Sequence, residues 1–348
     1  MADRPRRQEQ ERATAEVTEV AAGVLRCQLP IDMPGLGHVN CYVLEDERGV
    51  AVVDPGLPGR GTLKVLTKRL ASAGIPLARV HTVVITHSHP DHFGGAGWIR
   101  NETGAEIITH RRFSMIWDRA EPPDVDVEEL AELPRFPWDP PPWGGEGYPF
   151  PFRRRMRIRV SRRLPRLFRT PVPTVRVEDG QPIRLAGREW VSLHTPGHTE
   201  DHLCLFDPTE RVMLSGDHVL PTITPHIGGF NPSGDPLLAF FESLDKVAAA
   251  GPDVSIVLPA HGHPFDDLAG RAKAIKEHHV ERLEVLRRAA DEIGRPARVQ
   301  ELSTHLFSQR AQGSMADSET FAHLEHLRRA GEFERREAAS GYEYVRAG

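Results

Sequence analysis

The chain has 348 residues, of which 39% are hydrophobic and 27% are charged, a composition that is ordinary for a globular protein and can supply a sizeable core. Its formal net charge of -5 at pH 7 argues against binding nucleic acid over the whole surface. The sequence contains no apolar run long enough to span a bilayer, and its charged N-terminus lacks the apolar stretch of a signal peptide. No membrane association is therefore expected.

The chain has only three cysteines, which is a small and odd number for a disulfide framework, and none is part of a Cys-x-x-Cys pair. A reducing, cytoplasmic setting is the simplest interpretation. The three are Cys27, Cys41 and Cys204.

The first part of the chain alternates strand and helix patterns. Residues 1–16 carry mixed charge and are expected to be disordered. Residues 61–73 have apolar side chains at helical spacing, and Gly74 follows as a stop signal. Strands are predicted at 24–29, 39–44, 50–54 and 80–86. The alternation predicts a layered α/β arrangement.

The second half of the chain also contains predicted strands and a predicted helix. A helix is predicted at 235–250. Strands are predicted at 183–185, 189–193, 203–206, 211–214 and 254–258. Between the two halves lies the segment 118–175, which is rich in proline and aromatic residues and then carries nine arginines from Arg153 to Arg169 without an acidic residue. An insertion of this length is usually a functional loop or a disordered one.

The tail has a different pattern from the rest of the chain. A long helix is predicted at 266–293, before Gly294. Two shorter helices, at 299–307 and 318–330, precede a hairpin with strands at 333–336 and 342–346. We expect one domain over 17–270, with the 118–175 segment inserted in it, and a small second domain over 271–348.

A cluster of metal-ligand residues follows the strand predicted at 80–86. His87, His89, Asp91 and His92 lie within six residues, and imidazole nitrogens and carboxylate oxygens suit zinc as well as iron or manganese. His87 and His89 alternate on an extended loop, so they can face one point. Asp91 and His92 follow Pro90 on a turning backbone and can face a second point. The spacing therefore indicates two metal ions.

Three further ligand residues follow predicted strands far along the chain. They are His198, Asp217 and His261. Loops at strand ends gather on one side of such a scaffold, and a carboxylate with two oxygens can bridge two metals.

These motifs resemble the five-motif signature of the metallo-β-lactamase superfamily. The matching sequences are His-Ser-His-Pro-Asp-His at 87–92, Thr-Pro-Gly-His-Thr at 195–199, Gly-Asp-His at 216–218, Ala-His-Gly at 260–262 and the early Val-Asp-Pro-Gly at 53–56. The resemblance covers roughly residues 20–265 apart from the 118–175 segment. It implies an αββα sandwich with the metals at one edge of the sheets.

The resemblance also implies how the ligands divide. One metal takes His87, His89 and His198, and the other takes Asp91, His92 and His261. Asp217 bridges them, and Asp54 holds ligands in place from behind. The pattern is similar to glyoxalase II and ribonuclease-type members rather than to secreted β-lactamases, which use a cysteine at the second metal.

The predicted activity is hydrolysis of an ester, thioester or amide-like bond by a metal-bound hydroxide, with two divalent ions, zinc first and iron or manganese as alternatives. Asp91 is expected to orient the water, and His226 either contacts the substrate or is structural. A metallo-ribonuclease or phosphodiesterase and a mononuclear iron sulfur dioxygenase of the same fold stay open as alternatives.

The remaining histidines are expected to be structural. We interpret His194, His202 and His218 as packed or hydrogen-bonded residues, and His110, His278 and His279 as ordinary surface residues.

The arginine run has two interpretations. It is either a solvated, partly disordered face or a basic cap, including Arg153, Arg154 and Arg155, that receives a small anionic substrate such as a coenzyme A or glutathione conjugate, or nucleic acid. In the cap interpretation, the aromatic residues of 138–152 supply apolar contacts to the same ligand.

The tail resembles the winged-helix appendage of the β-lactamase-like protein 2 group. Its candidate recognition helix carries Asp317, Glu319 and Glu325, so packing or homodimerisation is favoured over nucleic-acid binding.

Overall fold

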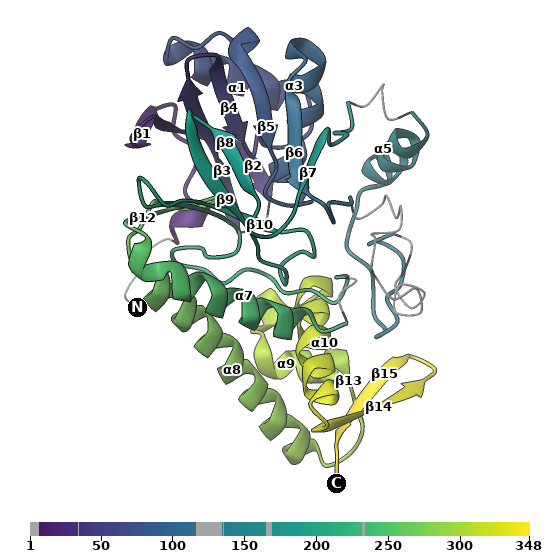
Figure 1. The fold of residues 1–348 in the computed structure, drawn as a ribbon. Coiled ribbons are helices and arrows are strands. Elements are labelled where there is room, and N and C mark those ends of the chain that lie inside the picture. The colour runs from purple at the N-terminus through teal and green to yellow at the C-terminus, as the bar shows by residue number, and fades with distance from the viewer. Residues whose placement is uncertain (1–6, 34, 116–133, 135, 165–168, 232–233) are drawn as a thin grey trace, which may run out of the picture.

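The computed structural model describes residues 7–33, 35–115, 134, 136–164, 169–231 and 234–348, and the statements below concern these residues. Two β-sheets lie face to face, with helices outside each of them and a helical C-terminal part below (Figure 1).

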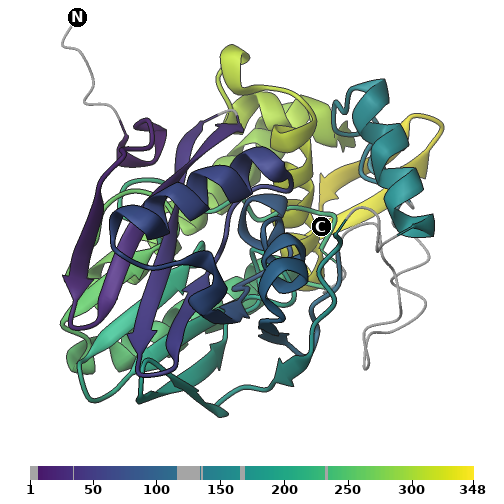
Figure 2. The same cartoon turned by 90° about the horizontal axis from the view of Figure 1, so that it is seen from above.

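The first sheet has seven strands in chain order, β1 to β7. The pairs from β1 to β4 are antiparallel, and those from β4 to β7 are parallel. Helices α1 and α3 connect the parallel strands and lie on the outer face (Figure 2). The strands are β1 (Val17–Ala21), β2 (Val24–Met33), β3 (Leu36–Asp46), β4 (Gly49–Val53), β5 (Val80–Val84), β6 (Glu106–His110) and β7 (Val175–Val177); the helices are α1 (Arg60–Ser72), η2 (Leu77–Arg79), α2 (Pro90–Phe93) and α3 (Ala96–Thr103).

The second sheet has five strands in the order β12-β11-β10-β9-β8. Only the β11–β12 pair is parallel, because α7 crosses over between those two strands. The elements are β8 (Pro182–Leu185), β9 (Arg188–His194), β10 (Leu203–Asp207), β11 (Val212–Gly216), α7 (Pro236–Ala250), η3 (Gly251–Asp253) and β12 (Ile256–Pro259).

Three apolar clusters correspond to the three interfaces of an αββα sandwich. The middle cluster joins the facing sides of the two sheets, with Tyr42 from β3 and Trp190 from β9. A second cluster lies between the first sheet and α1 and α3, including Leu66 and Ile99. The third lies outside the second sheet and includes Phe240 of α7. The αββα sandwich predicted from the motifs is confirmed.

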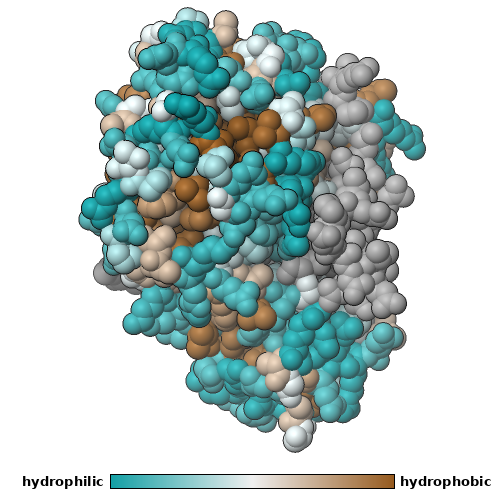
Figure 3. Space-filling view, in the orientation of Figure 1, coloured by the Kyte–Doolittle hydropathy of each residue, from teal (hydrophilic) through white to brown (hydrophobic). Residues whose placement is uncertain are grey.

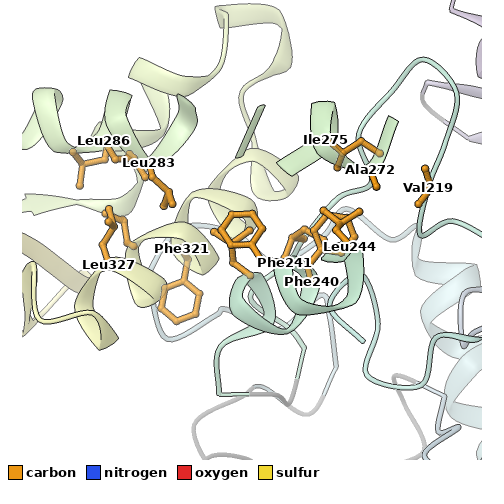
Figure 4. Packing of buried hydrophobic residues seen from close by; sticks show 14 of the residues in the cluster. Val219, Phe240, Phe241, Leu244, Ala272, Ile275, Leu283, Leu286, Phe321 and Leu327 are labelled. Atoms are coloured by element: carbon orange, nitrogen blue, oxygen red, sulfur yellow. The ribbon is translucent and has the colours of Figure 1, made fainter. Parts of the chain in front are cut away.

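The C-terminal part shares the third cluster instead of enclosing a separate one. Phe321 and Leu327 pack in the same cluster as Phe240 and Leu244 of α7 (Figure 4). The elements are α8 (Leu268–Ile293), β13 (Ala297–Arg298), α9 (Val299–Leu306), η4 (Gln309–Ala311), α10 (Ser314–Arg329), β14 (Phe333–Ala338) and β15 (Gly341–Arg346). The domain boundary and the winged-helix assignment stay predictions.

Helix α10, the candidate recognition helix, is largely buried. Its acidic residues have internal partners: Glu319 pairs with Arg282, and Glu325 accepts a 2.6 Å hydrogen bond from the hydroxyl of Tyr344. Most of its side chains therefore contribute to the core of the protein. Homodimerisation and nucleic-acid binding stay predictions.

The inserted segment packs against the C-terminal part. Residues 118–133, 135 and 165–168 of this prediction lie outside the described residues. Trp143 is 1% exposed and stacks on Phe321, with 4.4 Å between the ring centroids. Trp138 is also buried. The expectation that the aromatic residues of 138–152 supply a ligand-binding surface is therefore wrong for these two, which are core residues.

Helix α5 (Phe152–Arg163) carries most of the arginine run and lies at the side of the molecule, outside the two sheets (Figure 1, Figure 2). The interpretation of the arginine run as partly disordered is therefore wrong for residues 152–163, which form a helix.

The expectation that residues 1–16 are disordered is wrong where the chain is described. Residues 1–6 lie outside the described part. Residues 8–10 form η1 (Gln8–Gln10), and the Glu9 carboxylate is buried, accepting hydrogen bonds from the backbone N–H groups of Thr222 (2.9 Å) and Ile223 (3.2 Å). Composition alone did not indicate this partner.

The face of the molecule in Figure 3 is largely hydrophilic, and apolar residues gather mainly in its upper half. Over the described part of the chain, no helix combines the length and the apolar character that crossing a membrane requires.

The anchoring of the inserted segment by Trp143 gives a stability prediction. Trp143→Ala should lower the free energy of unfolding by about 3–5 kcal/mol, because it leaves a cavity in a packed core. Urea denaturation measures this. The control is Phe152→Ala, since Phe152 is an aromatic residue of the same segment that is 74% exposed. Equal effects of the two substitutions would contradict the packing described here.

Candidate metal centre

Every predicted metal ligand lies in the segment that follows a strand, five in loops or turns and two in a short helix. His87 and His89 follow β5, and His198 follows β9. Asp217 comes directly after β11, and His261 comes shortly after β12. Asp91 and His92 lie in α2, which Pro90 begins. The sheets end on the same side there, so the side chains of distant segments meet.

The first group consists of His87, His89, His198 and Asp217, whose candidate ligand atoms all lie within 4.8 Å of one another. Nδ1 of His89 lies 3.0 Å from Nε2 of His87 and 3.0 Å from Nε2 of His198. Three ring nitrogens thus face one small volume.

The second group consists of Asp91, His92 and His261. Asp217 lies between the groups: its Oδ2 is 3.5 Å from Nε2 of His198 in the first group and 3.5 Å from Nε2 of His92 in the second. Its Oδ1 is 3.2 Å from Nε2 of His261. The structure therefore brings all seven predicted ligands together, in the division and with the shared carboxylate that the motifs imply.

A layer of acceptors behind the histidines fixes which ring nitrogen carries the proton. Nδ1–H of His198 donates to the carbonyl oxygen of His226 at 2.7 Å, and Nδ1–H of His261 donates to that of His38 at 2.6 Å. A carbonyl oxygen can only accept, so Nε2 of each ring has its lone pair facing the centre.

Asp54 is the acceptor that fixes the protonated ring nitrogen in the ligands that follow β5. Its carboxylate accepts from the backbone N–H of Thr86 (2.9 Å), from the Thr86 hydroxyl (2.8 Å) and from Nδ1–H of His92 (2.9 Å). The Thr86 hydroxyl gives its proton to Asp54, so it can only accept from Nδ1–H of His87, 3.0 Å away. Asp54 therefore lies behind the ligands, which is the position that the resemblance implies for it.

This donor set fits metal ions. Nε2 of His92, Nε2 of His261 and Oδ1 of Asp217 are buried and have no hydrogen-bond partner among the described residues. Leaving buried polar atoms without a partner costs free energy, and a bound metal cation would remove that cost. Burial and the neighbouring histidines hold the pKa of His89 at about 3, so this ring is neutral at physiological pH.

The second group has an electrostatic field that favours positive charge. Burial by itself lowers the pKa of His92, but the carboxylates of Asp217, Asp91 and Asp54 outweigh it and raise that pKa well above its usual value. A field that holds a proton on an imidazole also attracts a metal cation.

His202 positions Asp217 and is not a ligand. Its Nε2 accepts the backbone N–H of Asp217 at 3.1 Å, and its other nitrogen bonds the Thr195 hydroxyl at 2.8 Å. Gly216 permits this close approach, because a Cβ there would lie 2.6 Å from Nε2 of His202, and its φ of 52° is left-handed. His202 is thus buried and hydrogen-bonded, as expected.

His226 contacts the candidate ligand His198 through its backbone carbonyl. Its carbonyl supports His198, while its ring lies between Oε2 of Glu319 (3.2 Å) and the Tyr148 hydroxyl (3.4 Å). The described contacts of the ring are therefore with α10 and the inserted segment. A direct contact of His226 with substrate stays a prediction.

Two histidines assigned to the surface are buried, so that expectation was wrong. His110 lies at the end of β6 and stacks on His194, with 3.8 Å between centroids. His279 lies on the inner face of α8, where its Nδ1 is 3.0 Å from Nε2 of His323 on α10. Neither had a recognisable motif, and only the phase of the long helix could have indicated His279.

The N-terminal segment also supports the centre, although neither its composition nor any motif in it indicated this. Nδ1–H of His38 donates to the carbonyl oxygen of Glu11 at 2.8 Å, and its Nε2 accepts the backbone N–H of Gly262 at 3.2 Å. The His38 carbonyl in turn holds His261. Residues 8–11 thus act on the second group through His38.

The arginines proposed for a cap divide between two environments. Arg153 and Arg154 line a cleft beside α2, together with Arg157. Arg155 turns away: its Nε donates to the carbonyl oxygen of Phe150 at 2.8 Å, and its guanidinium lies over the Trp138 ring. Including Arg155 among the cleft residues was therefore wrong, because helical phase places Arg157 there instead.

The sequence matches a protein family over most of its length. The profile described as the metallo-beta-lactamase superfamily matches residues 34–261. The probable metallo-hydrolase YqjP of Bacillus subtilis is 26% identical, over 74% of this chain and 77% of that protein. An atrochrysone carboxyl ACP thioesterase of Paecilomyces divaricatus is 30% identical, but over only 27% of each chain.

Two solved structures are similar over almost the whole chain. A metallo-beta-lactamase family protein from Thermus thermophilus is 29% identical with a TM-score of 0.73, covering 94% of this chain and 100% of that one. A beta-lactamase domain protein from Burkholderia ambifaria is 26% identical with a TM-score of 0.75, covering 97% and 95%. The similarity therefore includes the C-terminal part.

The contacts of Asp54 predict a loss of metal affinity on substitution. Asp54→Asn should weaken zinc binding about 10- to 100-fold, because an amide cannot accept from both Thr86 and His92 as the carboxylate does. Asparagine also tolerates the left-handed φ of 53° at this position, so the backbone should be kept. Competition with a chromophoric chelator measures the affinity.

The matched control is Asp46→Asn. Asp46 accepts two backbone N–H groups in the β3–β4 turn, away from the ligand loops. Zinc affinity equal to that of the unchanged protein in both variants would show that Asp54 does not position the ligands.

Proposed function

The chain belongs to the metallo-beta-lactamase superfamily, and from that membership we propose that it is a hydrolase that uses two divalent metal ions, zinc first, to cleave an ester, thioester or amide-like bond. Three histidines would hold one ion, Asp91, His92 and His261 would hold the other, and Asp217 would contribute to both. The observation that carries the proposal is the buried cluster of ring nitrogens and carboxylate oxygens, three of which have no hydrogen-bond partner among the described residues.

The chemistry of such a site needs no protein nucleophile. Two divalent ions, when bound, lower the pKa of water and stabilise negative charge on the attacked oxygen. Asp91 can orient that water, because His92 and His261 overcome the effect of burial and hold the pKa of Asp91 at about 2, so it is ionised at neutral pH. In a thioester, the water oxygen bonds to the carbonyl carbon, the carbon–sulfur bond breaks, and the thiolate takes up a proton.

A thioester is the first substrate to test. One similar protein carries the name of an acyl carrier protein thioesterase. The cleft beside α2 also offers arginines and apolar side chains to a bulky acyl substrate. The metallo-ribonuclease alternative loses some support from the burial of α10, whose acidic residues have internal partners. The iron sulfur dioxygenase alternative depends on which metal is bound, and metal analysis answers that.

The number of metals can be tested by substitution. Metal analysis of fully loaded protein should give two ions per chain. Asp217→Ala should reduce the content at both sites, because that carboxylate touches both groups, whereas His261→Ala should mainly lose the second ion. His110→Ala is the control, as a buried histidine outside both groups. One ion per fully loaded chain would contradict the proposal.

Activity should depend on these ions. Thioester, lactone, β-lactam and RNA substrates are screened with loaded and with chelated protein, and hydrolysis should disappear with chelator and return with zinc or manganese. Mass spectrometry should find no acyl group on Ser, Thr or Cys during turnover. A trapped acyl-enzyme, or full activity after removal of the metals, would contradict direct hydrolysis.

A further inference from the structure

A cleft of about 450 Å³ lies between α5 and the helix α2 that carries two of the candidate ligands. Pro90 and Phe93 of α2 line it, and they directly follow the ligands His89 and His92 in the chain. The volume is in the range of about 300–1,000 Å³ that small-molecule sites occupy. The cleft is thus lined by chain neighbours of the candidate ligands, although none of the seven ligands lines it.

The two sides of α5 have different surroundings. Arg153, Arg154 and Arg157 line the cleft, with Arg153 and Arg157 one helical turn apart. Behind them, Arg159 lies over the rings of Phe136 and Trp138, with its guanidinium carbon 5.6 Å and 5.7 Å from the ring centroids. The packing on the back of the helix fixes the direction in which the front presents its positive charge.

The positive charge of this cleft is poorly compensated. Arg169 also lines it, and Asp32 is the single acidic residue among the described lining residues. Arg153 and Arg157 are exposed, and no carboxylate partner is found for them in the described part of the chain. Guanidinium groups prefer phosphate and carboxylate, with which they form paired hydrogen bonds.

The opposite side of the cleft is apolar. Phe93 and Met115 are buried side chains that reach its surface, and Leu57 and Met33 lie beside them. The cleft thus joins a cationic side to an apolar side, next to the ligand helix.

We propose that this cleft binds the phosphate groups of a small thioester substrate of the coenzyme A type, with Arg153, Arg154 and Arg157 on the phosphates and the apolar side against the rest of the molecule. The proposal rests on the proposed hydrolase function and adds to it the class of substrate. A nucleotide-bearing thioester combines the two features that the cleft offers, several phosphates and a long, less polar arm. The carbonyl to be attacked then lies toward Pro90 and the metal centre.

Binding can be measured without turnover. The probes are coenzyme A, which has phosphates, and pantetheine, which has the same thiol arm without them. Isothermal titration of the zinc-loaded full chain should give a Kd for coenzyme A at least about tenfold lower than for pantetheine, which corresponds to about 1.4 kcal/mol. The preference should shrink as salt is raised.

The variant Arg153→Gln with Arg157→Gln should abolish this preference while leaving zinc content unchanged, since neither residue belongs to the metal groups. The control is Lys64→Gln with Lys68→Gln, which removes the same charge from two exposed positions one turn apart on α1 that do not line the cleft. Equal Kd values for the two probes, or equal losses in both double variants, would overturn the proposal. Tighter, arginine-dependent binding of a short RNA than of coenzyme A would also overturn it.

Hydrolysis separates this proposal from the proposed function. Butyryl-coenzyme A and butyryl-N-acetylcysteamine present the same acyl thioester with and without phosphates. We expect a KM at least tenfold lower for the coenzyme A thioester, and we expect the Arg153/Arg157 variant to lose that difference with little change in kcat for the phosphate-free thioester. Hydrolysis of both thioesters with the same KM overturns the substrate class and leaves the hydrolase function standing. Hydrolysis of neither by zinc-loaded protein refutes the thioesterase function itself.

Discussion

The carboxylate of Asp54 holds the loop on which the metal centre depends. It binds the backbone and hydroxyl of Thr86 and the far nitrogen of His92, and through Thr86 it also sets the protonation of His87. Carbonyl oxygens of His38 and His226 do the same for His261 and His198. Four imidazoles therefore turn Nε2 toward the centre, where a metal ion would take up their lone pairs. A sandwich whose strands end on one side supplies these acceptors from distant segments.

The ligands could be predicted from sequence because each is a polar residue just after an apolar strand, and the strand pattern says where it lies. The supports from main-chain carbonyls could not, because every residue has a carbonyl and nothing in a side chain marks the one that is used. The same holds for Glu9, whose partners are backbone N–H groups more than two hundred residues away. The composition of residues 1–16 indicated only that this segment is charged.

The error at Arg155 has a different origin. In a run of arginines, the sequence gives the charge but not the helical phase, and phase separates Arg157 in the cleft from Arg155 over Trp138. The burial of Trp143 and Trp138 could not be predicted either, because a proline-rich segment has no periodicity that indicates which side chains are buried. The core that receives Trp143 is formed by helices near the other end of the chain.

The link from the C-terminal helices to the metal centre affects how the protein is made. Glu319 of α10 holds the ring of His226, whose carbonyl orients His198, and Arg282 of α8 pairs with the same carboxylate. The chain leaves the ribosome from its N-terminus, so both sheets of the sandwich and all seven candidate ligands are synthesised before α10. The contact of Glu319 with the ring of His226 can form only when α10 has docked. A nascent chain should therefore acquire its sandwich first and its finished metal centre last.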